Sequence, residues 1–252
     1  MSIELISKKP LIVTIDESET LDIKTIDAGA AYTKYLHQQV GAFKEEPLSK
    51  YVDFVSKSIN PNAQRYREQS FEYIDLRDVD DIYGHILKVR KLKGKQIGSN
   101  KCRFQKWDIL LAKIMPSLEN KKITLVAEDV SNALASTEFI VLRKKTDANI
   151  NLFYLFRALR SDHFTQQAVA NVTGATGRQR INPTKLLELR ILVPPPDLQE
   201  KIGRAVEQEF TLHALSVEQT NRVDDETAPI LGPTTLRISK ASSRASTRRR
   251  RQ

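Results

Sequence analysis

The amino-acid sequence predicts an α/β (α+β) fold: a domain with a mixed sheet, followed by a long amphipathic helix and a disordered basic tail. Short apolar runs recur in the middle of the chain, helical apolar spacing lies between them, and both patterns stop near residue 223. The 252 residues are 40% hydrophobic with a mean hydropathy of −0.41, as expected for one globular domain with extensions. We therefore expect an N-terminal extension (1–46), one domain (47–196), one helix (197–222) and a tail (223–252).

The first half of the chain predicts short elements of both kinds. Residues 1–25 mix apolar groups with acids, as in a strand or an ordered arm, and Ile26–Val40 has helical spacing. Apolar residues also recur at helical spacing after Pro47, which predicts a second helix that ends before Pro61. The alternating segment Phe71–Leu76 predicts a strand, and three glycines bracket further short strands: Gly84, Gly94 and Gly98.

The second half predicts the centre of the sheet and then helices. Apolar runs predict strands at Trp107–Lys113, Ile123–Ala127 and Glu138–Leu142. The segment Asn151–Arg160 predicts a helix with one apolar face, and helical character continues to Val169.

The segment Thr173–Ile202 combines a polar loop, a short helical turn, an apolar strand, a proline stop and a new helix. Gly174 and Gly177 allow the backbone to turn or to approach a partner closely. The side chains of Arg178–Arg180 carry donors that suit phosphate oxygens and base edges. This loop is a candidate for contact with DNA bases; the alternative is a surface loop with incidental salt bridges.

Gly177–Gln199 resembles the end of a target recognition domain from the DNA specificity subunits of type I restriction-modification systems. There, a Gly-rich polar loop precedes an isoleucine, a short helix, an apolar strand, prolines and the Gln-containing start of a long helix. WDILLAKIMPS (Trp107–Ser117) is similar to the family's GDIL-x-A-R strand, and ALASTEFIVLR (Ala133–Arg143) to its next core strand. The resemblance covers approximately residues 47–222.

The resemblance implies that this loop and the basic turn after the GDIL-like strand contact DNA. The implied DNA-binding residues are Lys113, Ser117, Lys121, Lys122, Thr176, Arg178, Gln179 and Arg180. Long basic side chains in the turn suit the phosphate backbone, and the alternative is a solvated face. Trp107 stands within an apolar run, so we expect its side chain in the core rather than stacked on a base.

A long helix is predicted from Asp197 to Arg222, with Asp197 as N-cap and Glu200 as its capping-box partner. Its apolar stripe, which needs a surface to cover it, includes Leu198, Ile202, Ala205, Leu212 and Leu215. One alternative is packing onto the domain's own core. The resemblance implies instead a spacer that pairs with a second helix in a coiled coil, and we favour the spacer.

The function implied by the resemblance is sequence-specific binding of double-stranded DNA, without catalysis. The chain would recognise a short half-site and direct methyltransferase and restriction subunits to it, while AdoMet, ATP and Mg²⁺ would bind to those partners. A full specificity subunit carries two recognition domains and two spacer helices, whereas this sequence has one of each. Three alternatives remain open: a homodimer, a pair with a second half-specificity subunit, and a recognition domain recruited to another system.

The net charge of +9 is unevenly distributed. Residues 237–252 hold six arginines, one lysine and no acid, and residues 88–122 hold eleven basic residues against two acids. Basic patches attract polyanions, and nucleic acid is the commonest such partner. Nonspecific binding of nucleic acid through the tail is therefore an alternative function.

Catalytic and metal-binding motifs are scarce in the sequence. A phosphate-binding loop is missing, and the prolines at 194–196 lack the neighbours of an amino-methyltransferase motif. Asp108, Glu119 and Lys121 form the spacing of a Mg²⁺-dependent nuclease, which we keep as a minor alternative. The four histidines and the single cysteine, Cys102, show no spacing for a metal site. Without an apolar span or a signal-peptide pattern, we expect no membrane contact and a cytoplasmic protein.

Overall fold

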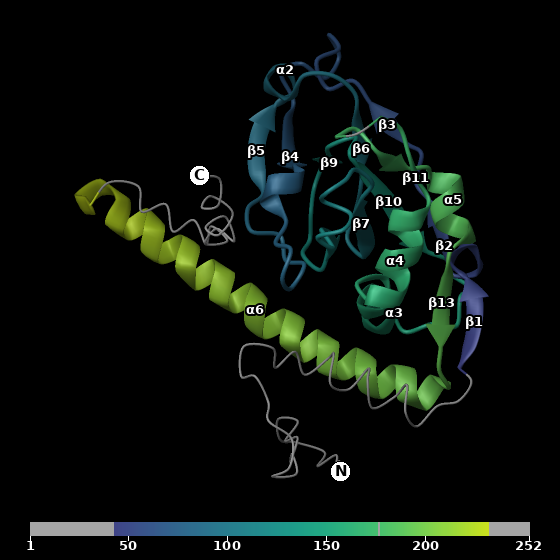
Figure 1. Cartoon of the computed structure of the whole chain (residues 1–252). Coiled ribbons are helices and arrows are strands. Elements are labelled where there is room, and N and C mark those ends of the chain that lie inside the picture. Colours follow the sequence, from purple (N-terminus) through teal and green to yellow (C-terminus); the bar gives the residue numbers. More distant parts are fainter. Residues whose placement is uncertain (1–42, 176, 232–252) are drawn as a thin grey trace, which may run out of the picture. The chain divides into compact units, whose positions relative to one another are not determined.

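The computed structural model describes residues 43–175 and 177–231 (Figure 1). The predicted arm, the helix at Ile26–Val40, Thr176 and the basic tail lie outside these residues. In the described part, no helix is both long and apolar enough to cross a bilayer.

The centre of the fold is a four-stranded antiparallel sheet in the order β2-β10-β7-β8. Its strands are β2 (Val52–Phe54), β10 (Phe139–Lys144), β7 (Asp108–Ala112) and β8 (Ile123–Leu125). Every residue of β7 is buried, because this strand is covered on both faces. The three apolar runs that predicted strands therefore do form the sheet core, as expected for strands without an exposed face.

A second, five-stranded sheet has the order β3-β6-β9-β4-β5. It contains β3 (Ser58–Ile59), β6 (Lys101–Arg103), β9 (Ala133–Ala135), β4 (Ser70–Ile74) and β5 (Arg90–Lys93). The β4–β9 pair is parallel and the other pairs are antiparallel, so the predicted mixed sheet is confirmed. The short helices η3 (Leu76–Asp78) and α2 (Gly94–Ile97) follow β4 and β5.

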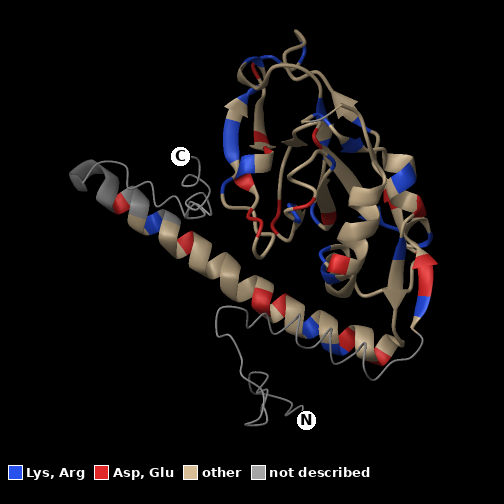
Figure 2. Ribbon diagram, viewed as in Figure 1, with Lys and Arg blue, Asp and Glu red and all other residues tan. Residues whose placement is uncertain are grey.

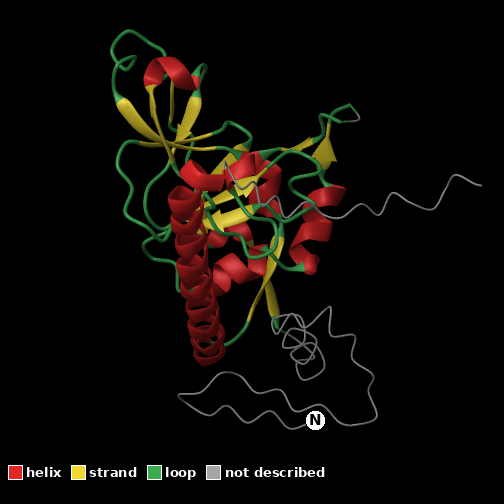
Figure 3. Cartoon of the chain, turned by 90° about the vertical axis from the view of Figure 1, so that its left-hand side faces the viewer, coloured by secondary structure: helices red, strands yellow, loops and turns green. Residues whose placement is uncertain are grey.

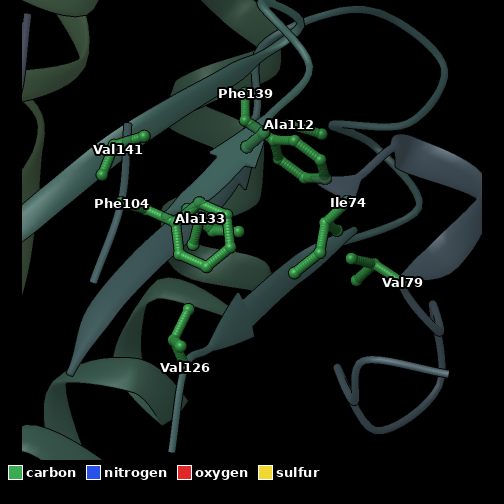
Figure 4. Close-up of a cluster of buried hydrophobic side chains, with 10 residues drawn as sticks. Ile74, Val79, Phe104, Ala112, Val126, Ala133, Phe139 and Val141 are labelled. Atoms are coloured by element: carbon green, nitrogen blue, oxygen red, sulfur yellow. The ribbon is translucent and has the colours of Figure 1, made fainter. Parts of the chain in front are cut away.

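The two sheets share a core of buried apolar side chains (Figure 4). Ile74, Ala133 and Ala135 come from the five-stranded sheet, and Leu110 and Val141 come from the four-stranded sheet. Ala112 and Phe139 also belong to the four-stranded sheet, and the other members lie outside the strands: Val79, Phe104 and Val126. Burial of these side chains stabilises the contact between strands that are far apart in the sequence.

Three helices with side-chain N-caps form the other part of the domain. They are α3 (Leu152–Leu159), α4 (Asp162–Ala170) and α5 (Pro183–Glu188), capped by Asn151, Ser161 and Asn182. Each cap accepts a backbone N–H that the first helical turn leaves unpaired. After α5, the predicted apolar strand β13 (Arg190–Val193) pairs with β1 (Lys44–Pro47).

The prediction of a helix between Pro47 and Pro61 is wrong. Only the short helix η2 (Leu48–Lys50) forms there, and it is followed by β2 and β3. Val52 lies opposite Lys144 and Phe54 opposite Leu142, so pairing with β10 decides the conformation. Apolar spacing in this segment was compatible with a helix, but β-branched and aromatic residues also suit a strand once a partner strand is present.

The long helix α6 (Pro196–Leu231) confirms the predicted helix and extends past Arg222 into the segment assigned to the tail. It begins at Pro196, a favourable first position for proline, so Asp197 lies in the first turn rather than at the N-cap. Glu200 accepts a hydrogen bond from the Asn151 side chain (3.0 Å) and does not show the predicted capping box.

The apolar stripe of α6 divides into two faces. Ile202, Val206 and Phe210 are each at most 9% exposed, whereas Leu212 and Leu215 are 67% and 52% exposed. The buried face lies against α3, where the Phe210 and Phe156 rings meet edge to face with 5.6 Å between centroids. The prediction of a partner surface is therefore wrong for Ile202, because residues four apart on a helix share one face and that face covers the domain.

The remaining predicted members of the stripe are partly or fully accessible. Leu198 is partly buried, while Ala205 is exposed together with the two leucines. Gly203 approaches α3 so closely that a Cβ atom would lie 2.2 Å from Asn151 Oδ1. The start of α6 is thus fixed on the domain, and its later exposed residues remain open to a partner.

Candidate nucleic-acid interface

The loop 174–180, which ends at the first residue of β12, connects the two strands of a small hairpin, β11 (Val172–Thr173) and β12 (Arg180–Ile181). Gly174 and Gly177 have φ angles of +114° and +80°, values that favour glycine. The Arg178 N–H donates to the Ala175 carbonyl (2.9 Å) and closes the turn. A Cβ at Gly174 would also lie 3.1 Å from the Arg178 carbonyl oxygen. Gly174 is therefore required by both its φ angle and this close approach, and Gly177 by its φ angle.

The hairpin is anchored to the segment that follows β7. The Ile181 N–H donates to the Lys113 carbonyl (2.9 Å), and the Met115 N–H donates to the Gln179 carbonyl (3.0 Å). An isolated β-bridge joins Ile114 to Arg180 between these bonds. The structure therefore brings the Gly-rich loop and the end of the GDIL-like strand together, although they are distant in the sequence.

Arg180 positions the loop rather than projecting from it. Its Nε and Nη2 donate to the two carboxylate oxygens of Glu138, each at 2.9 Å, and its Nη1 donates to the Arg178 carbonyl (2.8 Å). The Glu138 carboxylate raises the pKa of Arg180, so the guanidinium stays charged and paired. Three of the five N–H donors of Arg180 are thus bonded within the protein, which gives this side chain a supporting role in the free chain, and its contact with DNA stays a prediction.

Arg178 and Gln179 are the side chains of the loop that remain available. Arg178 is exposed and Gln179 is partly exposed. Within the described residues, neither side chain has a hydrogen-bond or ion-pair partner, although the backbone of both residues is bonded. At Arg178 and Gln179, the loop thus combines a hydrogen-bonded backbone with polar side chains whose donors suit base edges.

The predicted basic turn is divided between two roles. Lys113 and Ser117 are partly exposed beside the hairpin, and Lys113 forms no ion pair among the described residues. Lys122 Nζ donates to the carbonyls of Leu76 (3.0 Å) and Val79 (2.8 Å), so it is bonded within the free chain, and its contact with phosphates stays a prediction. The turn directs this side chain toward η3, where it satisfies two backbone acceptors.

Lys121 also faces away from the hairpin, toward the start of α4. Its Nζ lies 2.5 Å from an oxygen of Asp162, whose side chain is 80% exposed. Such an ion pair contributes little to stability and can be exchanged for another anion. Lys121 is therefore occupied in the free protein and belongs to a different surface from Arg178.

A buried arginine that the sequence did not single out holds this turn. Arg160, at the end of α3, donates through Nη1 to the carbonyls of Lys121 and Ile123 and through Nη2 to those of Asp81 and Ile82. Burial lowers the pKa of Arg160 to about 10. The Arg160 side chain thus holds the turn in place through hydrogen bonds. No local sequence pattern could predict this role, because the acceptors are backbone atoms of remote segments.

Trp107 is not a core residue, which corrects the prediction. Its side chain is 45% exposed and its φ is +70°. The ring contacts Phe153 edge to face at 6.3 Å between centroids, and Lys106 Nζ lies 5.3 Å from its centre. The apolar run continues into β7, but Trp107 belongs to the turn before that strand. Its backbone N–H donates to the Val126 carbonyl.

The nuclease alternative loses its central carboxylate. Asp108 is fully buried, and Arg143 donates to both of its oxygens at 2.7 and 2.8 Å, while the Gln105 N–H donates to one of them (2.8 Å). This contact with Asp108 raises the pKa of Arg143. Among the described residues, no cluster of His, Cys, Asp or Glu could hold a metal ion. Asp108 and Arg143 therefore form a structural ion pair.

The described residues combine two sheets, one of them mixed, a polar hairpin anchored beside β7 and a long terminal helix. The family model for the type I restriction modification DNA specificity domain matches residues 22–223. The chain belongs to this family, as the resemblance of its motifs indicated. No curated protein sequence matches the chain.

Solved structures agree with this assignment at the level of the fold. The HsdS subunit from Thermoanaerobacter tengcongensis is 22% identical, with a TM-score of 0.55, over 74% of this chain and 45% of that one. A chain from a structure on complex assembly and conformational transition of the type I R-M system is also 22% identical, with a TM-score of 0.55, over 75% of this chain and 46% of that one. The present chain thus spans less than half the length of either relative.

Proposed function

We propose that this chain is a DNA specificity subunit that recognises a short double-stranded half-site through the loop 174–180. The observation that carries the proposal is the loop itself: Arg180 and Glu138 fix its backbone, and Arg178 and Gln179 have unused donors. Arginine pairs with guanine and glutamine with adenine through two hydrogen bonds in the major groove. Membership of a DNA specificity family supports this role.

The chain acts without chemistry of its own and directs methyltransferase and restriction subunits to its site. AdoMet, ATP and Mg²⁺ bind to those partners. The pairing of Asp108 with Arg143 supports this division of labour, because the carboxylate suggested for a nuclease has no open position. The complex works on DNA in the cytoplasm.

Two recognition domains are needed for a two-part site, and we propose that a second chain supplies the other. The partner is a second copy or another half-specificity subunit, and the exposed residues of α6 form the contact: Ala205, Leu212 and Leu215. A two-fold pair of identical chains would read an inverted repeat whose spacing depends on the helices.

A competition assay tests the recognition loop. Arg178→Ala and Gln179→Ala together should reduce the preference for a selected duplex over a scrambled one, because each good base contact contributes about 1–3 kcal/mol of discrimination. Lys185→Ala, at an exposed position on α5 that is paired with Glu188, is the matched control. Full sequence preference in the loop variant would refute this placement of the recognition site.

A further inference from the structure

A second group of basic side chains lies on β5 and on the segment beside it, apart from the loop 174–180. We call this group the basic edge; it consists of Arg65, Arg67, Lys91, Lys93 and Lys95, all of them exposed. Strand β5 is the last strand of its sheet among the described residues, so one side of it has no neighbouring strand there. Lys and Arg gather along β5 and α2 in Figure 2.

Close packing holds the basic edge in one arrangement. The Lys95 N–H donates to the Arg67 carbonyl (3.0 Å), and the Gly94 N–H donates to the Gln69 carbonyl (2.9 Å). A Cβ at Gly94 would lie 2.2 Å from the Pro61 carbonyl oxygen. The segment 61–69 and α2 are therefore pressed together, and the basic side chains project from a fixed scaffold.

Two acids only partly balance these charges. Glu68 pairs with both Lys93 (3.3 Å) and Lys95 (3.1 Å), and all three side chains are exposed. Glu72 lies opposite Lys91 in the β4–β5 register, and its carboxylate accepts the Ser131 N–H (2.8 Å). Exposed ion pairs of this kind are weak, so the lysines can exchange them for phosphates.

Arg65, Arg67 and Lys91 form no ion pair within the described part of the chain. Arg65 lies over the Tyr66 ring at 4.6 Å. Five basic groups against two acids leave a surface with a net positive charge.

The basic edge and the recognition hairpin lie at the same end of the domain. In Figures 1 and 3, α2 and the β11–β12 hairpin both lie in the upper part of the domain, away from the start of α6, and Figure 3 shows them on opposite sides of that upper part. Lys91 and Lys93 point to the same face of β5 and are separated by about 7 Å, the rise of two residues in a strand. They can therefore contact separate phosphates.

We propose that the basic edge is a second DNA-contacting surface, which binds the phosphate backbone of the duplex whose bases the loop 174–180 reads. This inference rests on the proposed function. Phosphate contacts carry no sequence information, but they fix the orientation of a protein on the duplex. The basic edge thus supplies affinity and register, and Arg178 and Gln179 supply discrimination.

Protection of the sheet edge is the competing explanation for these lysines. Charged residues on a terminal strand prevent edge-to-edge association. That role requires lysines on β5, but it does not require Arg65 and Arg67, which precede β4 in the sequence. The two explanations predict different effects of neutralising charges on and beside the strand.

Salt-dependent binding of the full chain to DNA distinguishes them. The first variant combines Arg67→Gln with Lys91→Gln, and the second combines Arg65→Gln with Arg67→Gln and leaves the strand unchanged. The matched control combines Lys144→Gln on β10 with Lys201→Gln on α6, two lysines without an ion pair among the described residues. Fluorescence anisotropy measures the affinity for a selected duplex and a scrambled duplex at several salt concentrations.

Each lost phosphate contact should reduce the slope of log K against log salt by about 0.9, so both edge variants should lose about 2 from the slope. Their preference for the selected duplex should remain unchanged, and the control should match the wild type. An unchanged slope in the second variant would overturn the inference, and aggregation of only the first would then identify edge protection. A wild-type chain with no sequence preference would refute the proposed function instead.

Discussion

The pair formed by Arg180 and Glu138 should stabilise the loop 174–180 without contacting DNA. Replacing either residue with alanine removes two hydrogen bonds of 2.9 Å between charged groups. Hydrogen bonds to charged groups contribute about 1.5–3 kcal/mol, but these side chains are 37% and 28% exposed, so solvent reduces the value. We expect each single variant to lower the free energy of unfolding by about 1 kcal/mol.

A double-mutant cycle gives the interaction between the two side chains separately from their other contacts. Arg180→Ala, Glu138→Ala and the double variant are unfolded in urea, and each is also tested for preference between selected and scrambled duplexes. The coupling energy should be about 1 kcal/mol. Both single variants should discriminate less well between duplexes, because the loop that presents Arg178 is no longer held.

Arg178→Ala is the control for this cycle, since its side chain has no partner within the described residues. It should leave the free energy of unfolding unchanged within about 0.5 kcal/mol while reducing sequence preference. If Glu138→Ala retained full preference, or if the coupling energy were zero, the reasoning that Arg180 positions the loop would be refuted.

Three further predictions concern the turn before β7, the contact of α6 and the exposed helix face. Trp107→Gly should change the free energy of unfolding by less than about 1 kcal/mol, because glycine relieves the positive φ and only a half-exposed ring is lost; a loss above 3 kcal/mol in urea unfolding would contradict this. His85 is buried against Phe210 of α6, with 4.2 Å between ring centroids, and burial lowers its pKa to about 4. The folded state therefore favours the neutral imidazole, so this contribution to stability is present above pH 6.5 and should disappear as the pH falls toward 4. His85→Phe should flatten that part of the pH profile of the free energy of unfolding, and an unchanged profile would contradict the account. Leu212→Asp with Leu215→Asp should abolish association in light scattering while circular dichroism stays native, whereas Ile202→Asp should unfold the domain.

Elements defined by local apolar patterns could be predicted from the sequence. Strand β7 contains the apolar run 109–112, β10 contains the apolar run 139–142, and α3 has a regular apolar face, so each pattern is contained within the element. The segment after Pro47 could not be predicted, because its strand depends on pairing with β10, which lies far along the chain. Local spacing does not contain that information.

In the candidate site, too, local features could be predicted and long-range contacts could not. The Gly-rich loop could be located because glycine and polar residues mark a turn wherever they occur. The roles of its arginines could not be separated, because the partner of Arg180 is Glu138, 42 residues away. Lys122 similarly has a side chain that suits a phosphate, but its Nζ donates to backbone carbonyls at η3 and at the residue after it. Long-range contacts, rather than residue types, decide which basic groups remain available.

Selection of bound sites from a randomised duplex pool tests the central claim most directly. The full chain should enrich one short motif, and a paired assembly should enrich two copies of it as an inverted repeat with fixed spacing. The Arg178→Ala variant should lose preference at particular positions of that motif. Binding without any enriched motif, lost on deletion of residues 237–252, would contradict the account and identify nonspecific binding through the tail.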